Sequence, residues 1–223
     1  MPNTPALPSP EKHIAESTVR RLSLYLRVLD QAAARGLQTI SSVVLAEEGG
    51  TTSAQVRKDL SFFGSFGKRG RGYDVAELVT ALQDILGLGR EWKVYIVGAG
   101  KIGSALVSYR GFSQRGFRVV GIYDNNPQMV GRMLDGVGIR SMAQLEHDAA
   151  RELPDIAVLT VPAEHAQAVA DRVVAAGIRA IMNFAPAPLH VPPSVTVKSV
   201  NMALELEGLA YALVRRDAGE PPR

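Results

Sequence analysis

Apolar residues in the first third of the chain recur at spacings of three and four, which is the period of an α-helix. The pattern predicts four helices, at residues 16–35, 42–48, 53–62 and 74–86. The first carries a single apolar stripe, made of Val19, Leu22, Leu26 and Leu29. Gly36 can end this helix, and Thr52 or Ser53 can cap the third helix at its N-terminus. These short helices predict a small helical domain.

A glycine-rich segment, residues 64–73, separates the third and fourth helices. Four of its ten residues are glycine, so it cannot remain helical, and aromatic residues near its ends favour a tight β-hairpin. Three helices followed by a glycine-rich basic hairpin form the outline of a winged helix-turn-helix domain.

Beyond Gly87 the pattern changes to short apolar runs that alternate with helical segments. The runs predict strands at residues 94–97, 119–123, 156–161, 180–184 and 195–200. Helices are expected at residues 101–109, 142–149 and 163–176, with a final amphipathic helix at 202–214. Such alternation predicts right-handed βαβ units and a parallel sheet, so the expected fold class is α/β.

The first predicted strand runs directly into the motif G-x-G-x-x-G, formed by Gly98, Gly100 and Gly103. In a dinucleotide-binding turn the first glycine permits the tight turn, the second lets the backbone approach a pyrophosphate, and the third lets the helix pack on the strand. Asp124 ends the next strand about 20 residues later, where a carboxylate can accept both ribose hydroxyl protons. The same charge would repel the extra phosphate of NADP, so NAD is the expected ligand of a Rossmann-type domain.

Two further segments follow predicted strands, at the sheet edge where ligands collect. Their proline residues are also simple strand terminators, so we rank them second. The residues that the pattern assigns to dinucleotide binding are Gly98, Ala99, Gly100, Lys101, Ile102, Gly103, Asp124, Thr160, Val161, Pro162, Asn183, Phe184 and Ala185.

Charge is distributed unevenly along the chain. The formal net charge is only +3, but five basic residues against one acid between Ser53 and Tyr73 give that window a charge of +4. A local basic patch is the electrostatic footprint of a nucleic-acid surface, although a solvated basic face is an alternative for the patch alone.

The third helix and the hairpin together suit a DNA duplex. Gln55 can bond adenine and Arg57 can bond guanine in the major groove, while a slim cationic hairpin fits the minor groove. The expected DNA-binding residues are Ser53, Gln55, Arg57, Lys58, Ser61, Phe62, Lys68, Arg69, Arg71 and Tyr73. A helical protein-interaction module with a charged loop is the alternative.

Several other classes find little support. The chain has no cysteine, which excludes disulfides and thiol redox sensing, and its 4 histidines show no metal-ligand spacing. No apolar run approaches the roughly 20 residues that cross a bilayer, and the first ten residues lack the order of a signal peptide, so a cytoplasmic protein is expected. A dehydrogenase would need a positioned acid or base; His165 is the best candidate, and a solvent-facing position is its alternative. A CoA-binding module would share the glycine loop and the sheet.

The strings Gln55–Gly64 and Phe66–Tyr73 resemble the Rex family of redox-sensing transcriptional repressors. The resemblance covers nearly everything from Ser17 to Val214. It continues through Ile85–Leu88, Val97–Leu106, Tyr109–Phe112, Leu159–Pro162 and Asn183–Pro186.

This resemblance implies a homodimer that binds palindromic operator DNA when NAD⁺ prevails and releases it when NADH accumulates. It implies that the C-terminal helix is exchanged between subunits, that Tyr109 lies at the nicotinamide pocket and that Tyr109 couples this pocket to Arg27. The family's partner for both is an aspartate; here that position is Asn201, and Met202 stands where an aromatic is often found. Asn201 cannot supply the anion for Arg27, which predicts a smaller coupling energy. Arg71 replaces a usually apolar wing residue.

The expected organisation follows from these elements. It comprises an arm at residues 1–15, a winged-helix domain at 16–88, a Rossmann-type domain at 89–200, the C-terminal helix at 201–216 and a tail at 217–223.

Overall fold

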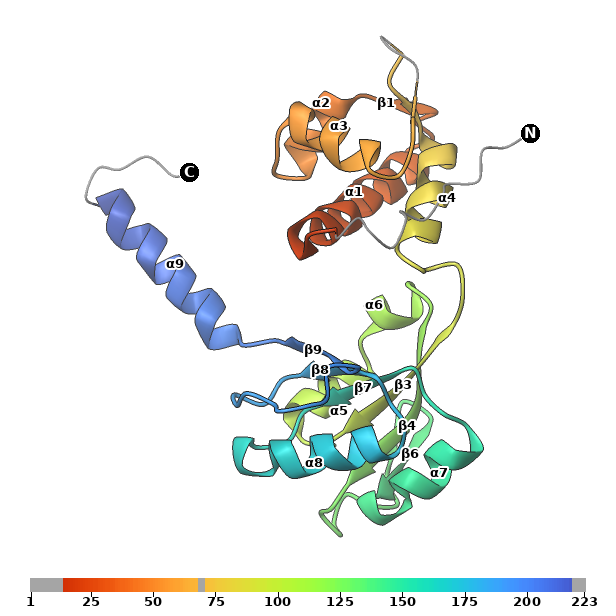
Figure 1. Cartoon of the computed structure of the whole chain (residues 1–223), viewed down its shortest axis with the longest axis vertical. Coiled ribbons are helices and arrows are strands. Elements are labelled where there is room, and N and C mark those ends of the chain that lie inside the picture. Colours follow the sequence, from red (N-terminus) through yellow and green to blue (C-terminus); the bar gives the residue numbers. More distant parts are fainter. Residues whose placement is uncertain (1–13, 68–70, 218–223) are drawn as a thin grey trace. The chain divides into compact units, whose positions relative to one another are not determined.

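The computed structural model describes residues 14–67 and 71–217 (Figure 1). The chain divides into two compact units, one ending at Arg90 and the other beginning at Glu91. No helix among the described residues is both long and apolar enough to span a membrane.

The first unit is built from four helices and a two-stranded sheet. Its elements are α1 (Glu16–Ala34), β1 (Thr39–Ile40), α2 (Ser42–Glu48), α3 (Ser53–Ser61), β2 (Tyr73–Asp74) and α4 (Val75–Ile85). Ser41, Thr52 and Asp74 cap the last three helices with side-chain oxygens that accept backbone N–H groups. Leu22, Leu26 and Leu29 lie in the core as the apolar stripe predicts, whereas Val19 is 42% exposed.

The predicted hairpin at residues 64–73 is only partly described, because Lys68, Arg69 and Gly70 lie outside the described residues. Its C-terminal end forms β2, which pairs antiparallel with β1, the strand that precedes α2. A Cβ atom on Gly72 would lie 2.6 Å from the carbonyl oxygen of Ile40, and Gly72 has φ +77°. Glycine is therefore required where the segment returns to the sheet.

The second unit is a seven-stranded sheet with the order β5-β6-β4-β3-β7-β8-β9. Only the β5–β6 pair is antiparallel. Its strands are β3 (Trp92–Val97), β4 (Phe117–Asp124), β5 (Met133–Leu134), β6 (Val137–Ser141), β7 (Ile156–Leu159), β8 (Ala180–Asn183) and β9 (Thr196–Ser199). Without β5, this is the strand order of a Rossmann fold, so the predicted α/β class is confirmed.

Helices cover both faces of this sheet. They are α5 (Lys101–Val107), α6 (Arg110–Ser113), α7 (Leu145–Arg151) and α8 (Ala163–Ala175). A further helix, α9 (Met202–Asp217), follows the last strand and covers neither face. One core cluster packs α7 and α8 on one face, and a second packs Val107 of α5 on the other face. In α9, by contrast, every described side chain is exposed.

The sequence pattern missed α6 and the β5–β6 hairpin, and it merged a 3-10 turn (Met142–Gln144) with α7. The hairpin turns at Asp135 and Gly136, which have φ values of 47° and 79°. An Asp-Gly pair in this conformation is a strong hairpin signal, so the residues did carry the information.

Candidate functional site

The glycine turn after β3 is shaped by two different demands. A Cβ atom on Gly98 would lie 2.8 Å from the carbonyl oxygen of Thr160, and one on Gly103 would collide with the carbonyl oxygen of Gly98. These two glycines are required by packing. A Cβ atom on Gly100 would meet nothing within 4 Å, so its backbone faces open space. The motif therefore leaves room for a ligand at its second glycine only.

Thr160 joins the turn to the neighbouring strand. Its hydroxyl donates to the carbonyl oxygen of Gly98 at 2.7 Å, and its backbone N–H donates to that of Val97 at 2.8 Å. The strands β3 and β7 are adjacent but not consecutive in sequence, so their carboxyl ends form the topological switch point of the sheet. Ligands of open α/β sheets bind at this point.

Asp124 occupies the rim of the same opening. One carboxylate oxygen accepts a hydrogen bond of 2.6 Å from the backbone N–H of Ala99, and the other accepts one of 2.7 Å from Asn126. The carboxylate is thereby aimed across the glycine turn. Because each oxygen can accept about two hydrogen bonds, capacity remains for a ligand hydroxyl.

A cleft of about 190 Å³ lies between these elements. Of the predicted residues it is lined by Gly98, Gly100, Asp124, Thr160, Val161 and Pro162. The sequence reasoning missed Val97, Tyr123, Asn125, Met142 and Val169 as lining residues, and it weighed His165 only as a catalytic candidate or a surface residue. The hydroxyl of the fully buried Tyr123 donates to Asp148 at 3.0 Å, and burial raises its pKa.

The second-rank segment after β8 has a local structural role. Asn183 is fully buried, and its amide group bonds the backbone of Ala185 and Ala187 at 3.0 and 2.9 Å. Phe184 donates its backbone N–H to Leu159. Neither these residues nor Tyr109 line the cleft.

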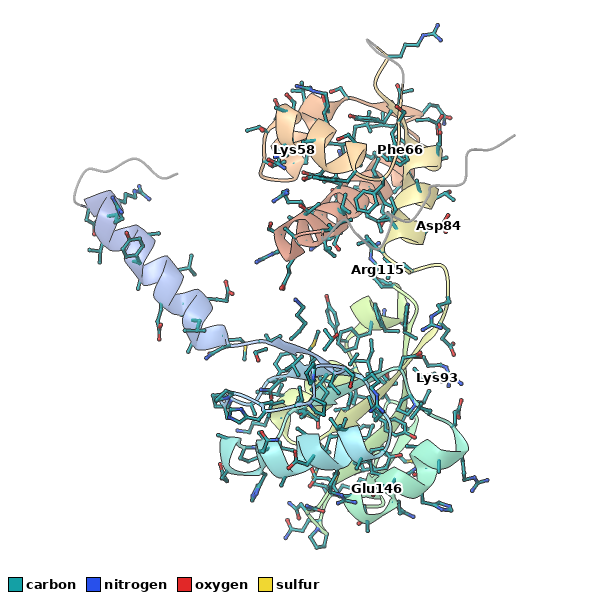
Figure 2. The ribbon with its side chains drawn as sticks, viewed as in Figure 1. Lys58, Phe66, Asp84, Lys93, Arg115 and Glu146 are labelled. Carbon is teal, nitrogen blue, oxygen red and sulfur yellow. The ribbon has the colours of Figure 1, made fainter. Side chains whose placement is uncertain are left out.

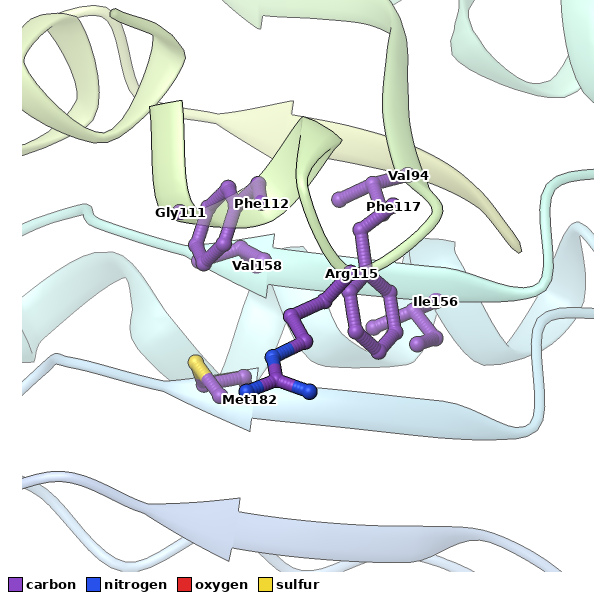
Figure 3. Close-up of a pocket in the computed structure, with 8 residues that line it drawn as sticks. All are labelled: Val94, Gly111, Phe112, Arg115, Phe117, Ile156, Val158 and Met182. Atoms are coloured by element: carbon purple, nitrogen blue, oxygen red, sulfur yellow. The ribbon is translucent and has the colours of Figure 1, made fainter. Parts of the chain in front are cut away.

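A second cavity, of about 230 Å³, differs in both place and chemistry (Figure 3). Its walls are apolar apart from Arg115, and it lies against Val94, Phe117 and Ile156, which are at or near the amino ends of their strands. A pyrophosphate needs N–H donors at the carboxyl ends of the strands, so the first cleft is the candidate dinucleotide site.

The exposed face of α3 is basic. Arg57, Lys58 and Ser61 are exposed, and Figure 2 shows Lys58 projecting from this helix. The guanidinium of Arg57 donates to the hydroxyl of Ser42 at 3.0 Å, which joins α3 to α2. Phe62, at 39% exposure, continues this surface beyond the end of the helix.

The one acidic residue of the basic window is removed from this surface. Asp59 is fully buried and accepts bidentate hydrogen bonds of 2.6 and 2.8 Å from Arg21 of α1, with a further bond of 2.9 Å from the Tyr25 hydroxyl. Burial alone would raise the pKa of Asp59, but the hydrogen bonds from Arg21, Gln55 and Tyr25 hold it below its usual value. Burial and the bond to Asp59 raise the pKa of Tyr25 to about 12.

Two predicted DNA contacts are placed differently from the expectation. Tyr73 lies in the core at 8% exposure, because the β1–β2 pairing turns it inward. Gln55 is half-buried, and its amide nitrogen donates to Asp59 at 2.7 Å. Ser53 is half-buried and Arg71 is exposed, while Lys68 and Arg69 lie outside the described residues.

The predicted coupling residues are divided between the two units. Arg27 is exposed on α1, and Tyr109 is 59% exposed with its ring edge-on to Phe112 at 5.3 Å. The Asn201 side-chain oxygen accepts a bond of 3.0 Å from Ala203 at the start of α9, and Met202 is exposed. Asn201 is thus a capping residue of the C-terminal helix.

Comparison with known proteins adds the family. A family model described as a CoA binding domain matches residues 89–187, and one described as a putative DNA-binding protein N-terminus matches residues 13–61. The redox-sensing transcriptional repressor Rex of Carboxydothermus hydrogenoformans is 45% identical, over 92% of this chain and 98% of that protein. The Streptomyces coelicolor protein of the same name is also 45% identical, over 93% and 80%.

The chain belongs to the Rex family of redox-sensing transcriptional repressors.

Solved structures agree with this assignment. The Rex-family repressor RSP in complex with β-NADH is 36% identical with a TM-score of 0.85, over 93% of this chain and 98% of that chain. RSP in complex with β-NAD⁺ and operator DNA is 38% identical with a TM-score of 0.87, over 93% and 96%. The relatives are named repressors over nearly the whole chain, which decides against the dehydrogenase and makes this chain a regulator. The CoA-binding description matches only part of the chain.

Proposed function

We propose that this Rex-family chain is a cytoplasmic repressor that holds operator DNA with its first unit and releases it when NADH occupies the cleft of its second unit. One observation carries the proposal. The cleft combines an open Gly100 backbone with an aspartate aimed across the glycine turn, in a family whose member RSP was solved with β-NADH and with β-NAD⁺ and operator DNA.

The cleft residues fit such a dinucleotide. The backbone at Gly100 and the N-terminus of α5, with Lys101 and Ile102, would receive the pyrophosphate, because free N–H groups and the helix dipole favour anions. Asp124 would accept ribose hydroxyl protons and repel a 2′-phosphate, which selects NAD(H) over NADP(H). The backbone of Thr160–Pro162 would lie beside the nicotinamide end.

The first unit fits duplex DNA. The exposed Arg57 and Lys58 of α3 would enter the major groove with Ser61, and Arg71 would reach a phosphate or the minor groove together with Lys68 and Arg69. Asp59, the one acid between Ser53 and Tyr73, is buried and paired with Arg21, so it does not offset the exposed charges of Arg57 and Lys58, which attract the phosphate backbone.

The exposed apolar side chains of α9 support a homodimer. This helix carries apolar side chains on most of its sides, and Leu206, Leu209 and Leu213 are each more than half exposed. A helix that exposes this much apolar side chain needs cover, and exchange with a second copy would supply it. Two copies would also present two α3 helices to a palindromic operator. Replacing Leu206 and Leu209 together by glutamate should convert the dimer to monomers in sedimentation equilibrium.

The proposed switch would couple NADH binding in the second unit to DNA binding by the first unit. We place Tyr109, Arg27, Asn201 and Met202 in it, with Asn201 as a neutral partner in place of the family's aspartate. NADH can shift the population only by binding the DNA-free state better, and operator DNA must weaken NADH binding by the same factor. The neutral Asn201 reduces the coupling energy, since charge-assisted hydrogen bonds are about twice as strong as neutral ones.

The experiment is a titration of the protein–operator complex with NADH and, separately, NAD⁺, followed by band shift. Release at far lower NADH than NAD⁺ supports the proposal, and equal potency contradicts redox sensing. Gly100→Ala is a matched variant, because its Cβ atom would enter the open cleft without touching the protein. It should bind DNA normally and respond weakly to NADH. Gly138→Ala in β6, whose Cβ atom would make only an ordinary contact of 3.5 Å with the sulfur of Met133, should behave as the unaltered protein.

A further inference from the structure

The buried carboxylate of Asp59 determines whether the amide of Gln55 on α3 presents its oxygen or its nitrogen. Gln55 lies in the first turn of α3, beside the exposed residues Ala54 and Lys58. Residues at the start of such a helix are the ones that reach base edges. The amide of Gln55 is not free to rotate, however, because its nitrogen donates to Asp59 at 2.7 Å.

The chemistry of Asp59 makes this orientation obligatory. The carboxylate is fully buried and ionised, with its pKa held low by Arg21, Gln55 and Tyr25. A carboxylate can only accept hydrogen bonds, so only the amide nitrogen of Gln55 can face it. Among the described residues the Gln55 amide oxygen accepts no hydrogen bond, and no buried side-chain oxygen there lacks a partner, so this oxygen is the end open to the surroundings.

The cluster of Asp59 with Arg21, Tyr25 and Gln55, here called the Asp59 clamp, is also rigid. Two nitrogens of Arg21 bond the two oxygens of Asp59 at 2.6 and 2.8 Å, and Arg21 bonds the buried Thr18 at 3.0 Å. Tyr25 adds its hydroxyl at 2.9 Å. Every acceptor site of the carboxylate is thereby used, so Asp59 itself has no capacity left for DNA and cannot turn away from Gln55.

We infer that Gln55 is a specificity-determining residue that reads a base amino group through its carbonyl oxygen, and that Asp59 is the positioning residue that fixes this polarity; the inference rests on the proposed DNA-reading role of α3. In the major groove, adenine N6 and cytosine N4 are the amino donors, whereas guanine and thymine present only acceptors and a methyl group. Each half-site should therefore carry one position where adenine or cytosine is selected on one strand and guanine or thymine is rejected.

The test selects duplexes with a randomised core on the full-length protein with NAD⁺, for the unaltered chain and its variants. Gln55→Met keeps the size of the side chain and removes its polar end. It should flatten the preference at one position in each half-site by at least about fivefold, while every other position keeps its preference. If Gln55→Met selects the same bases at every position, the inference about Gln55 is overturned, while the proposed DNA-binding function of the chain still stands. Absence of any selected sequence in the unaltered chain overturns the proposed function itself.

Asp59→Asn tests the positioning. An asparagine whose amide nitrogen takes the place of Oδ1 gives up the bond from the Arg21 terminal nitrogen and can donate to the Gln55 oxygen. The Gln55 amide would then turn and present its N–H groups, so the preference should move towards guanine or thymine at that one position. A general loss of affinity with the same preference would show a merely structural role and contradict the assignment. If this variant does not fold, Gln55→Met still decides whether the position is read.

Two control variants distinguish the effect of the Asp59 clamp on stability from its effect on base preference. Gln167 and Asp171 of α8 form the same pair at the same spacing, with a bond of 2.7 Å, in the other unit. Asp171→Asn should leave the selected sequence unchanged. Tyr25→Phe removes one donor from Asp59 but keeps the bond to Gln55, so it should lower stability without altering the preference.

Discussion

Two aspartates, one in each unit, hold functional elements by different means. Asp59 is fully buried and accepts bonds only from side chains, which come from Arg21, Tyr25 and Gln55 on α1 and α3. Asp124 ends a strand at the rim of a cleft, and the bonds it accepts come from the backbone N–H groups of Ala99 and Asn126.

The difference shows what each carboxylate can do. With all its acceptor sites used and no contact with water, Asp59 can position neighbours but cannot bind a ligand. Asp124 is held in place by two bonds and keeps acceptor capacity facing the cleft. Burial thus separates a carboxylate that organises the DNA-reading helix from one that is available to a dinucleotide.

Removing each carboxylate should have unequal effects on stability. Asp59→Ala leaves the Arg21 guanidinium without its partner and should lower the free energy of unfolding by about 3–5 kcal/mol. Asp124→Ala loses two bonds at a partly exposed site and should cost about 1–2 kcal/mol. Denaturation followed by circular dichroism, with hydrogen exchange of α1 amides, measures both. Equal losses of unfolding free energy in the two variants would contradict the different structural roles of Asp59 and Asp124.

NADH binding and operator recognition should be lost in different variants. Asp124→Asn removes a charge-assisted bond and should weaken NADH binding by about 1.5–3 kcal/mol, with DNA binding unchanged. Arg57→Ala should cost roughly 1–3 kcal/mol of operator discrimination and leave NADH affinity intact. Calorimetry with NADH and band shifts with matched and mismatched operators measure the two. A variant that loses both functions would show unfolding instead of a local effect.

The smallest expected effect concerns Tyr25. Tyr25→Phe should lower the free energy of unfolding by about 1 kcal/mol at neutral pH, through loss of the bond to Asp59. The pKa of Tyr25 is raised to about 12 in the folded chain, so its contribution is complete below the unfolded value of about 10 and is lost as the pH rises towards 12. The stability difference between the two proteins should therefore shrink and reverse over this range. A constant difference in parallel denaturation curves would contradict the raised pKa.

Local features were predictable from the residues alone. The period of Leu22, Leu26 and Leu29 specified α1, and Thr52 and Ser53 were the two candidate caps for α3, of which the structure uses Thr52. The roles of Gly98 and Gly103 also followed from the motif, because backbone conformation and helix–strand spacing make demands that a few neighbouring residues meet. The Asp-Gly turn before β6 carried a similar signal that the pattern reading overlooked.

Other features were decided only by tertiary structure. Asp59 is a buried partner of Arg21, 38 residues away, where the charge count alone had treated it as part of the surface. Thr160 supports a turn 62 residues away, and Tyr73 enters the core because β2 pairs with a strand before α2. The sequence determined periods, caps and turns, which depend on neighbours along the chain. Whether a polar side chain is clamped, exposed or open to a ligand depends on what the packed unit places against it, and no local spacing encodes that.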